Sequence, residues 1–483
     1  MKRKFWQPRT LLWLCWLAYV ITAGGHFSAT DEEDLFTNTA LLSHLMLSPI
    51  GLDTAQVNAE RGPQEVGQSL VALPWYWLGR ALIQPLHPRW HAYAMRAVMT
   101  TFNIFITLAT IWVLHRWLIE LASPQLALAV AALYGLGTLA WPYSQTFYRE
   151  PLVGLCLLIA FWYGGRFQKS HHRNPLFISL AAMLLAVMTK TTAVIAIPWW
   201  LIVVIPTPRL QKQHLGTGVL ITGAVMTTAV LILPAKLATL QAYGQEISFD
   251  LQQNLPAMWQ YGLHGLLTSP GKGLLITTPP ILLALFGFPQ FWREQRRLAG
   301  AIAGVGLSFL LVYSTRRGWH GGASWGPRYL LPVLPLLLLP TVNVMRLGWG
   351  TAVIPPSQQT LVRITVIGLA ALGVMVQLSA VAIFPLNYYH LKIQQGVVQP
   401  AHLEGGRTYL QELYFDPQHS PIWGQAALAL HRIQHINHYG VTDAPQAFPA
   451  TADSLWHYFI TADTLDFWWL HGWQRSVYMD YSD

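Results

Sequence analysis

The sequence carries little charge: Asp, Glu, Lys and Arg together make up 11% of its 483 residues, whereas 53% are hydrophobic. Soluble domains carry about 25% charged residues, so this composition excludes an ordinary soluble protein. Cysteine is also scarce. Cys15 and Cys156, the two cysteines, both lie in apolar runs, which excludes a disulfide framework or a cysteine-based metal site.

The sequence contains many long apolar runs. A helix needs about 20 residues to cross the hydrocarbon core, so we predict an all-α polytopic membrane protein. Residues 1–384 form its transmembrane domain, and residues 385–483 form a small extracytoplasmic C-terminal domain. The eleven predicted spans are 11–25, 92–114, 125–143, 150–165, 176–189, 191–206, 217–234, 274–291, 299–315, 329–345 and 362–384.

The distribution of charge predicts the orientation of these spans. The segments assigned to the cytoplasm, together with Arg363, hold 15 Lys and Arg against only Glu120 and Glu294. This is the positive-inside pattern, and it places the N-terminus in the cytoplasm and the C-terminus outside, as in a bacterial-type plasma membrane. The net charge of +9 therefore reports orientation and gives no case for nucleic acid. The inner segments are 1–10, 115–124, 166–175, 207–216, 292–298 and 346–361.

The N-terminal run also has the form of a secretory signal, but Trp13 and Trp16 favour a retained span. It is followed by a long outer segment, 26–91. Within that segment, residues 67–77 are apolar and aromatic and predict a helix lying in the interface. Pro74 and Arg80 make a twelfth span the weaker alternative.

Four consecutive acids, Asp31 to Asp34, follow the first span directly. Such a cluster must be hydrated, paired or metal-bound, because like charges repel one another. One interpretation is a solvated loop. The other is the catalytic edge of a membrane enzyme, which the cationic outer stretches described next favour.

Three further outer stretches carry ionisable residues. The turn at 143–151 ends in Arg149 and Glu150, which form either an interfacial ion pair or part of a site. A second outer loop, 235–273, ends in Ser-Pro-Gly-Lys-Gly around Lys272. Glycines beside a lysine let backbone N–H groups approach an anion, although a plain turn would have the same composition.

The third stretch, 315–329, contains Arg317, His320, Arg328 and four glycines between tryptophans. An interfacial anchor would explain the tryptophans and arginines but not the glycines. Flexible backbone beside fixed cations favours close approach to a phosphate, which arginine binds bidentately.

The order of these features resembles the polyprenyl-phosphate-dependent glycosyltransferases of the GT-C superfamily. The shared features are acids after span one, an Arg-Glu turn after span three, the Ser-Pro-Gly-Lys-Gly loop and the Trp-Gly-Pro-Arg-Tyr-Leu-Leu-Pro stretch. Bacterial relatives of protein O-mannosyltransferases and lipid A aminoarabinose transferases are the most similar groups. The resemblance covers about residues 11–345. The Lys-Pro-Pro of the aminoarabinose branch is absent, since Gly62-Pro63-Gln64 stands there without a lysine.

The resemblance implies a membrane glycosyltransferase of the cell envelope that takes a sugar from a polyprenyl-phosphate donor at the extracytoplasmic face. Asp31 or Glu32 would be the general base on an acceptor hydroxyl, and Glu150 would orient the base or the acceptor. The donor phosphate would lie against a cationic set. That set comprises Arg149, Lys272, Arg317, His320 and Arg328.

The partners implied are the lipid-linked donor and an acceptor glycan, lipid or protein. No cofactor or metal ligand is assigned, although a divalent cation is left open, as are the sugar and the oligomeric state. A transporter or flippase of polyprenyl-linked sugars is the main alternative. It would place polar residues at mid-depth, and we find none. A non-catalytic scaffold with a partner-binding tail is a third interpretation.

Overall fold

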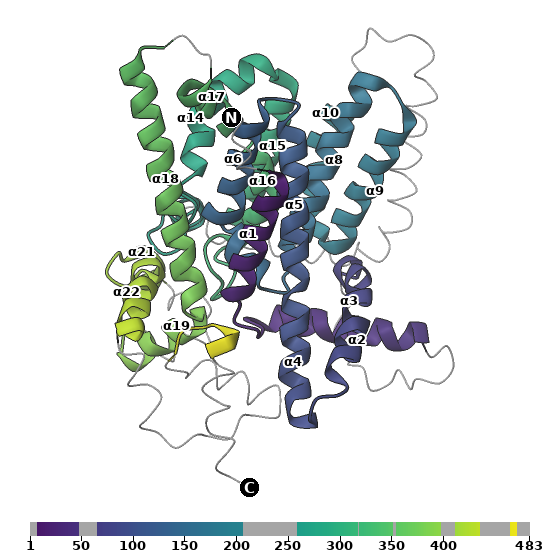
Figure 1. Cartoon of the computed structure of the whole chain (residues 1–483), viewed down its shortest axis with the longest axis vertical. Helices are drawn as coiled ribbons and strands as arrows, with labels where there is room; N and C mark the ends of the chain where they lie inside the picture. Colours follow the sequence, from purple (N-terminus) through teal and green to yellow (C-terminus); the bar gives the residue numbers. More distant parts are fainter. Residues whose placement is uncertain are drawn as a thin grey trace.

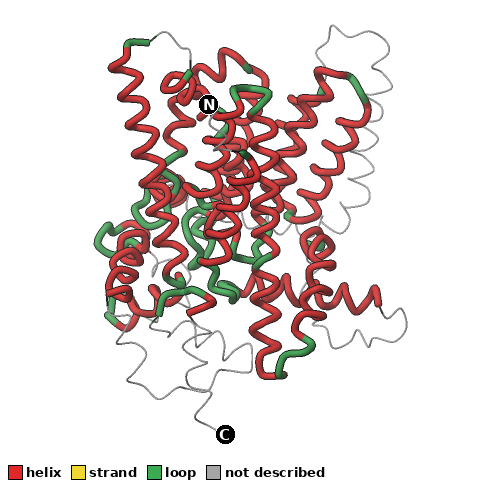
Figure 2. Tube along the Cα trace, viewed as in Figure 1, coloured by secondary structure: helices red, strands yellow, loops and turns green. Residues whose placement is uncertain are grey.

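The computed structural model describes residues 7–47, 65–205, 258–316, 318–350, 354–397, 411–434 and 464–470. Within these ranges every regular element is a helix (Figure 2). Most helices stand side by side, and others lie across one end of them (Figure 1). The described loops gather toward that same end (Figure 2).

The upright helices account for most of the predicted spans. Proline begins several of them, because its missing N–H has no partner in the first turn. They are α1 (Pro8–Ile21), α4 (Pro88–Thr100), α5 (Phe102–Leu118), α6 (Pro124–Gly137), α8 (Glu150–Ser170), α9 (Arg173–Thr189), η2 (Thr191–Ala196), α10 (Ile197–Val204), α14 (Ile281–Glu294), α15 (Arg296–Ser314), α17 (Thr341–Trp349) and α18 (Pro356–Ala382).

Three stretches among the described residues are long and apolar enough to cross a membrane: Trp90–Leu118, α15 and α18. A fourth is added if the bent pair Arg328–Leu337 and α17 forms one span. This apolar, helical architecture is that of an integral membrane protein. The count of eleven stays a prediction, and the predicted span 217–234 lies outside the described residues.

Two predicted spans are interrupted where prolines remove backbone donors. The run 329–345 divides into η5 (Arg328–Val333), α16 (Leu334–Leu337) and α17, with a bend of 47°. The run 274–291 divides into α13 (Leu274–Thr277) and α14, with Pro279 and Pro280 between them.

The first outer segment is more helical than its polarity indicates. Helix α2 (Thr30–Leu47) begins within the acid cluster and runs crosswise beside α3 (Gly67–Ile83) (Figure 1). Asp31, Glu32 and Glu33 occupy the first turn of α2, where the helix dipole favours negative charge. Helix α3 contains the predicted interfacial stretch, with Pro74 inside it.

Three separate groups of buried apolar side chains hold these parts together. The largest lies among the upright helices. A second, including Phe27, Tyr76 and Phe147, lies beneath α2 and α3. The third, including Tyr388 and Tyr414, joins the end of α18 to the C-terminal elements. Those elements are α19 (Pro385–Gln394), α21 (Gln411–Phe415) and α22 (Pro421–Gln434). The boundary at 384 stays a prediction.

Candidate active site

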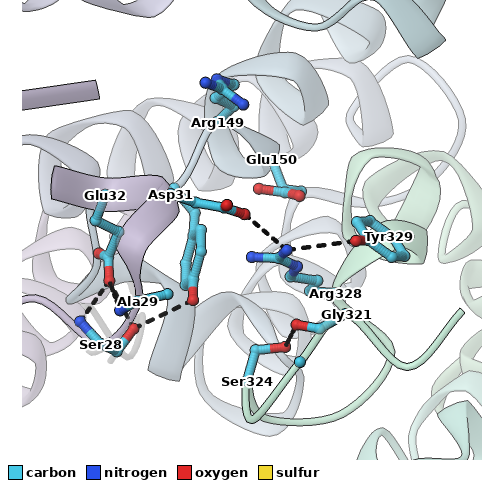
Figure 3. A network of polar contacts seen from close by, with 12 residues as sticks. Ser28, Ala29, Asp31, Glu32, Arg149, Glu150, Gly321, Ser324, Arg328 and Tyr329 are labelled. Atoms are coloured by element: carbon cyan, nitrogen blue, oxygen red, sulfur yellow. Dashed lines mark hydrogen bonds and ion pairs between the residues drawn. The ribbon is translucent and has the colours of Figure 1, made fainter. Parts of the chain in front are cut away.

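Arg328 and Asp31 form an ion pair between the first turn of α2 and the start of η5 (Figure 3). The Nη2 of Arg328 donates to Oδ2 of Asp31 at 2.7 Å. The arginine side chain is 9% exposed, but the aspartate is 45% exposed. The carboxylate is thus available to an incoming group, whereas the guanidinium is fixed.

Two aromatic rings hold the guanidinium of Arg328. Its Cζ lies 4.7 Å from the centre of the Tyr148 ring and 5.0 Å from that of Tyr329. Such contacts stabilise a cation that has lost its water. The Nε of Arg328 is buried without a hydrogen-bond partner.

A glycine-rich loop, residues 318–326, lies beside Arg328. Gly321 and Gly322 have φ angles of 68° and 74°, which residues with a Cβ rarely adopt. A Cβ on Gly321 would lie 2.9 Å from the Nε of Arg328. The glycine is therefore required for the arginine to pack against this loop, which explains a composition that an interfacial anchor does not need.

Lys272 fixes the glycine-rich loop through hydrogen bonds to its backbone. Its Nζ donates to the backbone oxygen of Gly322 at 3.0 Å and also to that of Ser324. The ammonium lies 5.2 Å from the centre of the Tyr414 ring. Burial, and then the charge of Arg328, hold the pKa of Lys272 well below its ordinary value. These contacts make Lys272 a loop-positioning residue; phosphate binding by its side chain stays a prediction.

Glu32 points away from Arg328 and is completely buried (Figure 3). Its Oε2 accepts hydrogen bonds from the backbone N and Oγ of Ser28, at 2.5 and 2.6 Å, and from the N of Ala29 at 3.2 Å. The backbone N–H of Phe147 donates to Oε1. Burial raises the pKa of Glu32 to about 7, although these hydrogen bonds oppose the shift. Glu32 therefore fastens the start of α2 to the turn before α8.

Glu33, the next acid, pairs with Arg96 of α4 through both carboxylate oxygens, at 2.7 and 2.8 Å. The acids that looked equivalent in the sequence thus have different partners. Asp31 contacts the arginine at the site, Glu32 contacts backbone donors, and Glu33 anchors α4. The helical backbone separates them, since neighbouring residues lie about 100° apart around a helix axis.

Glu150 begins α8 and is buried near Arg328 (Figure 3). Its Oε1 lies 2.5 Å from the Nζ of Lys190, which lies 4.7 Å from the centre of the Tyr329 ring. Lys190 was not predicted as a site residue. The one sequence signal for a role of Lys190 was its position between the predicted spans 176–189 and 191–206, because a lysine at the end of a span needs a partner.

The remaining predicted cations contribute differently. Arg149 lies 3.5 Å from Glu65 and thereby contacts the segment before α3. The Nδ1 of His320 accepts from the backbone N of Gly322 at 2.9 Å, and burial followed by the Lys272 charge lowers the pKa of His320 to about 3. A neutral imidazole adds no charge for a phosphate. Arg317 lies outside the described residues.

A cavity of about 60 Å³ lies next to this centre, with Ser28, Tyr148 and Ser324 in its wall. The lining of the cavity also contains His26 and Asp466, whose Nε2 and Oδ1 are 2.7 Å apart. Sequence reasoning did not find this pair, because the two residues are 440 positions apart and Asp466 stands in no motif.

The C-terminal segment is fastened to the end of α1 at this point. The indole Nε1 of Trp468 donates to the backbone oxygen of Val20, and that of Trp469 to the oxygen of Ile21, both at 2.8 Å. The backbone N of Trp468 also donates to the oxygen of Ala23 at 2.7 Å. Carbonyls at the end of a helix have no partner within it, so the tail supplies one.

Within the described residues, no group of three His, Cys, Asp or Glu side chains could hold a metal ion. The centre that the structure does assemble is an acid–arginine pair at one end of a helical membrane protein. It can bind an anion through the guanidinium and accept a proton at the neighbouring carboxylate.

No family model matches the sequence, and no curated protein matches it. Among solved structures, the chain is similar to ArnT from Cupriavidus metallidurans bound to undecaprenyl phosphate. The identity is 15% and the TM-score 0.42, over 94% of this chain and 84% of that one. The apo state of the same protein gives 14% identity and a TM-score of 0.43, over 94% and 83%. Both scores are too low to assign a function to this chain.

Proposed function

We propose that this protein is a GT-C-type membrane glycosyltransferase that transfers a sugar from a polyprenyl-phosphate donor to an acceptor hydroxyl at the extracytoplasmic face. The observation that carries the proposal is the 2.7 Å pair between Arg328 and Asp31, a fixed cation beside a half-exposed carboxylate. The motifs that resemble this superfamily contain both residues. The acceptor is a glycan, a lipid or a protein.

The proposed reaction uses the two members of the pair for different steps. The donor phosphate binds the guanidinium of Arg328 and competes with Asp31 for it. The released carboxylate accepts the proton of the acceptor hydroxyl while the oxygen of that hydroxyl bonds to the sugar's anomeric carbon. The bond from that carbon to the phosphate oxygen breaks, and the phosphate keeps the electron pair.

The chain's own geometry supports each step. A placed carboxylate supplies about 10²–10⁴-fold by proton transfer. A buried guanidinium held between two rings stabilises charge on the leaving phosphate without having to reorganise. Glu150 lies near the same guanidinium (Figure 3) but is ion-paired with Lys190. It therefore suits positioning Arg328 better than taking a proton.

The test is to incubate the purified full-length protein, in lipid, with radiolabelled polyprenyl-phosphate sugars and membrane extract. We expect label to move from the donor into an acceptor fraction with wild type and not with Asp31→Asn. Label that crosses vesicles while still attached to the lipid would instead indicate a transporter. Donor binding without any transfer by wild type would indicate a scaffold.

A further inference from the structure

A second cavity, of about 240 Å³, lies at the opposite end of the upright helices from the candidate site. Helix α8 connects the two places. Its first residue, Glu150, lies at the candidate site, and its last turns carry Arg166 and Lys169, which line the cavity. A helix of this length spans about 30 Å, which is also the thickness of the hydrocarbon core. The cavity thus lies at headgroup depth on the predicted cytoplasmic face.

The lining of this cavity has more cations than anions. Lys169 and Arg166 come from α8, and Arg296 and Arg297 come from the start of α15. Two carboxylates also line it, and both are already engaged. Glu120 lies 3.8 Å from Arg166 and accepts from the Trp162 indole at 3.1 Å. Glu294 is paired with Arg346 at 2.8 Å.

Two of the four cations, Lys169 and Arg296, are solvent-exposed and have no ion-pair or hydrogen-bond partner for their side chains among the described residues. The Nη1 of Arg297, by contrast, is buried without a hydrogen-bond partner. The positive-inside rule requires cations in these loops, but it does not require them to converge on a cavity. A buried donor without a partner, beside two further unpaired cations, favours an anionic ligand.

The surroundings favour a ligand with apolar chains. Ile205, whose backbone oxygen accepts from Arg297, is 48% exposed, and Trp292 of α14 is 43% exposed. Trp162 and Trp117 lie in the cavity wall, and tryptophan is enriched at the level of lipid headgroups. A soluble anion would gain nothing from the exposed apolar side chains, whereas a lipid would cover them.

We propose that this cavity binds the phosphate headgroup of an anionic membrane lipid, with Lys169 and Arg296 as its charged ligands. The site is separate from the candidate catalytic centre and does not depend on the function proposed for that centre. The phosphate enters between the ends of α8 and α15, and the acyl chains lie along the exposed apolar side chains of α14 and α15.

The experiment measures lipid retained by the purified full-length protein in detergent, by native mass spectrometry. Phosphatidylglycerol is titrated against phosphatidylcholine, and inorganic phosphate is the competing soluble anion. We expect wild type to retain phosphatidylglycerol preferentially. The double variant Lys169→Gln/Arg296→Gln should lose about tenfold or more of that affinity, because it removes both charged ligands of the phosphate.

The matched control is Arg173→Gln/Arg293→Gln, which removes the same charge from the same face outside the cavity. It should retain the lipid as wild type does. The double variant Lys169→Arg/Arg296→Lys keeps the charge and should restore binding. Equal loss in the control, or no preference by wild type, would overturn the proposal. Displacement of the lipid by millimolar inorganic phosphate would identify a soluble phosphate site and also overturn the lipid assignment.

Discussion

Arg328 and Asp31 lie 297 positions apart in the sequence, and their side chains meet at 2.7 Å. Arg328 begins η5, just after the glycine-rich loop, and Asp31 comes from a helix that lies across the ends of the upright helices. Because only the arginine is buried, the pair leaves one partner accessible to substrate.

Asp31→Asn should lower turnover by about 10²–10⁴-fold, because the amide cannot accept the acceptor's proton. Donor affinity should not fall, since the substitution removes the charge that competes for Arg328. Transfer rate and donor binding are measured together, with Asp34→Asn as the control from the same helix. If neutralising each of the four acids gave equal and mild losses, the cluster would only set a local field, and the base would have to be Glu150.

Arg328→Lys should weaken donor binding by about tenfold or more, because an ammonium cannot reproduce the guanidinium fork or its stacking between two rings. The measurement is a donor-binding isotherm. Arg173→Lys, at the distant end of α9, is the control. Unchanged donor affinity in Arg328→Lys would reduce this arginine to an interface anchor.

Three alanine substitutions in the glycine-rich loop can separate the effect of backbone strain from the effect of a Cβ contact with Arg328. Gly321→Ala combines a positive φ with a Cβ 2.9 Å from the Nε of Arg328, whereas Gly322→Ala has the positive φ with nothing within 4 Å. Gly318→Ala has neither. A left-handed conformation costs a residue with a Cβ about 1–2 kcal/mol.

We therefore expect donor affinity to fall most for Gly321→Ala, less for Gly322→Ala and hardly at all for Gly318→Ala. Isothermal binding of the donor decides the order. Identical values for the first two variants would show that the Cβ contact with Arg328 has no effect on binding.

The pKa of Glu32, raised to about 7 from an ordinary 4.5, predicts how stability depends on pH. Below the ordinary value both folded and unfolded states hold the proton. As pH rises, the unfolded state releases it first, so the contribution of Glu32 to the free energy of unfolding falls until about pH 7 and is constant above. Thermal unfolding of wild type should show this fall, and Glu32→Gln should lack it. Parallel profiles for the two proteins would contradict the shift.

The orientation is tested by reporter fusions on described loops. Fusions at Arg173 and Gln295 should report the cytoplasm, and those at His87 and Gln418 should report the outside, because basic residues gather on the former side. An outside signal at Gln295 would place the second cavity outside and the candidate site on the cytoplasmic face, which would contradict both assignments of sidedness.

Apolar runs predicted most of the helices. In lipid every backbone N–H and C=O needs a hydrogen-bond partner, and a helix supplies these partners within its own segment. The loops that bear Arg328 and Lys272 were also identified from their glycines and cations. What the sequence could not show is which acid faces which cation. That depends on α2 forming from a polar stretch and turning Asp31 and Glu32 to different sides. The roles of Lys190 and Asp466 depend on contacts between distant segments and have no local signal.

The hydrogen bond from Trp468 to Val20 joins residues 448 positions apart. A ribosome makes the first helix long before it makes this tryptophan. During synthesis, the carbonyls of Val20 and Ile21 therefore have no indole donor until residues 468 and 469 have been added. The wall that Asp466 adds beside the candidate site is also missing until then. A chain terminated before Asp466 would keep its membrane helices but would have an open site, so the site is closed later than the helices that carry it are made.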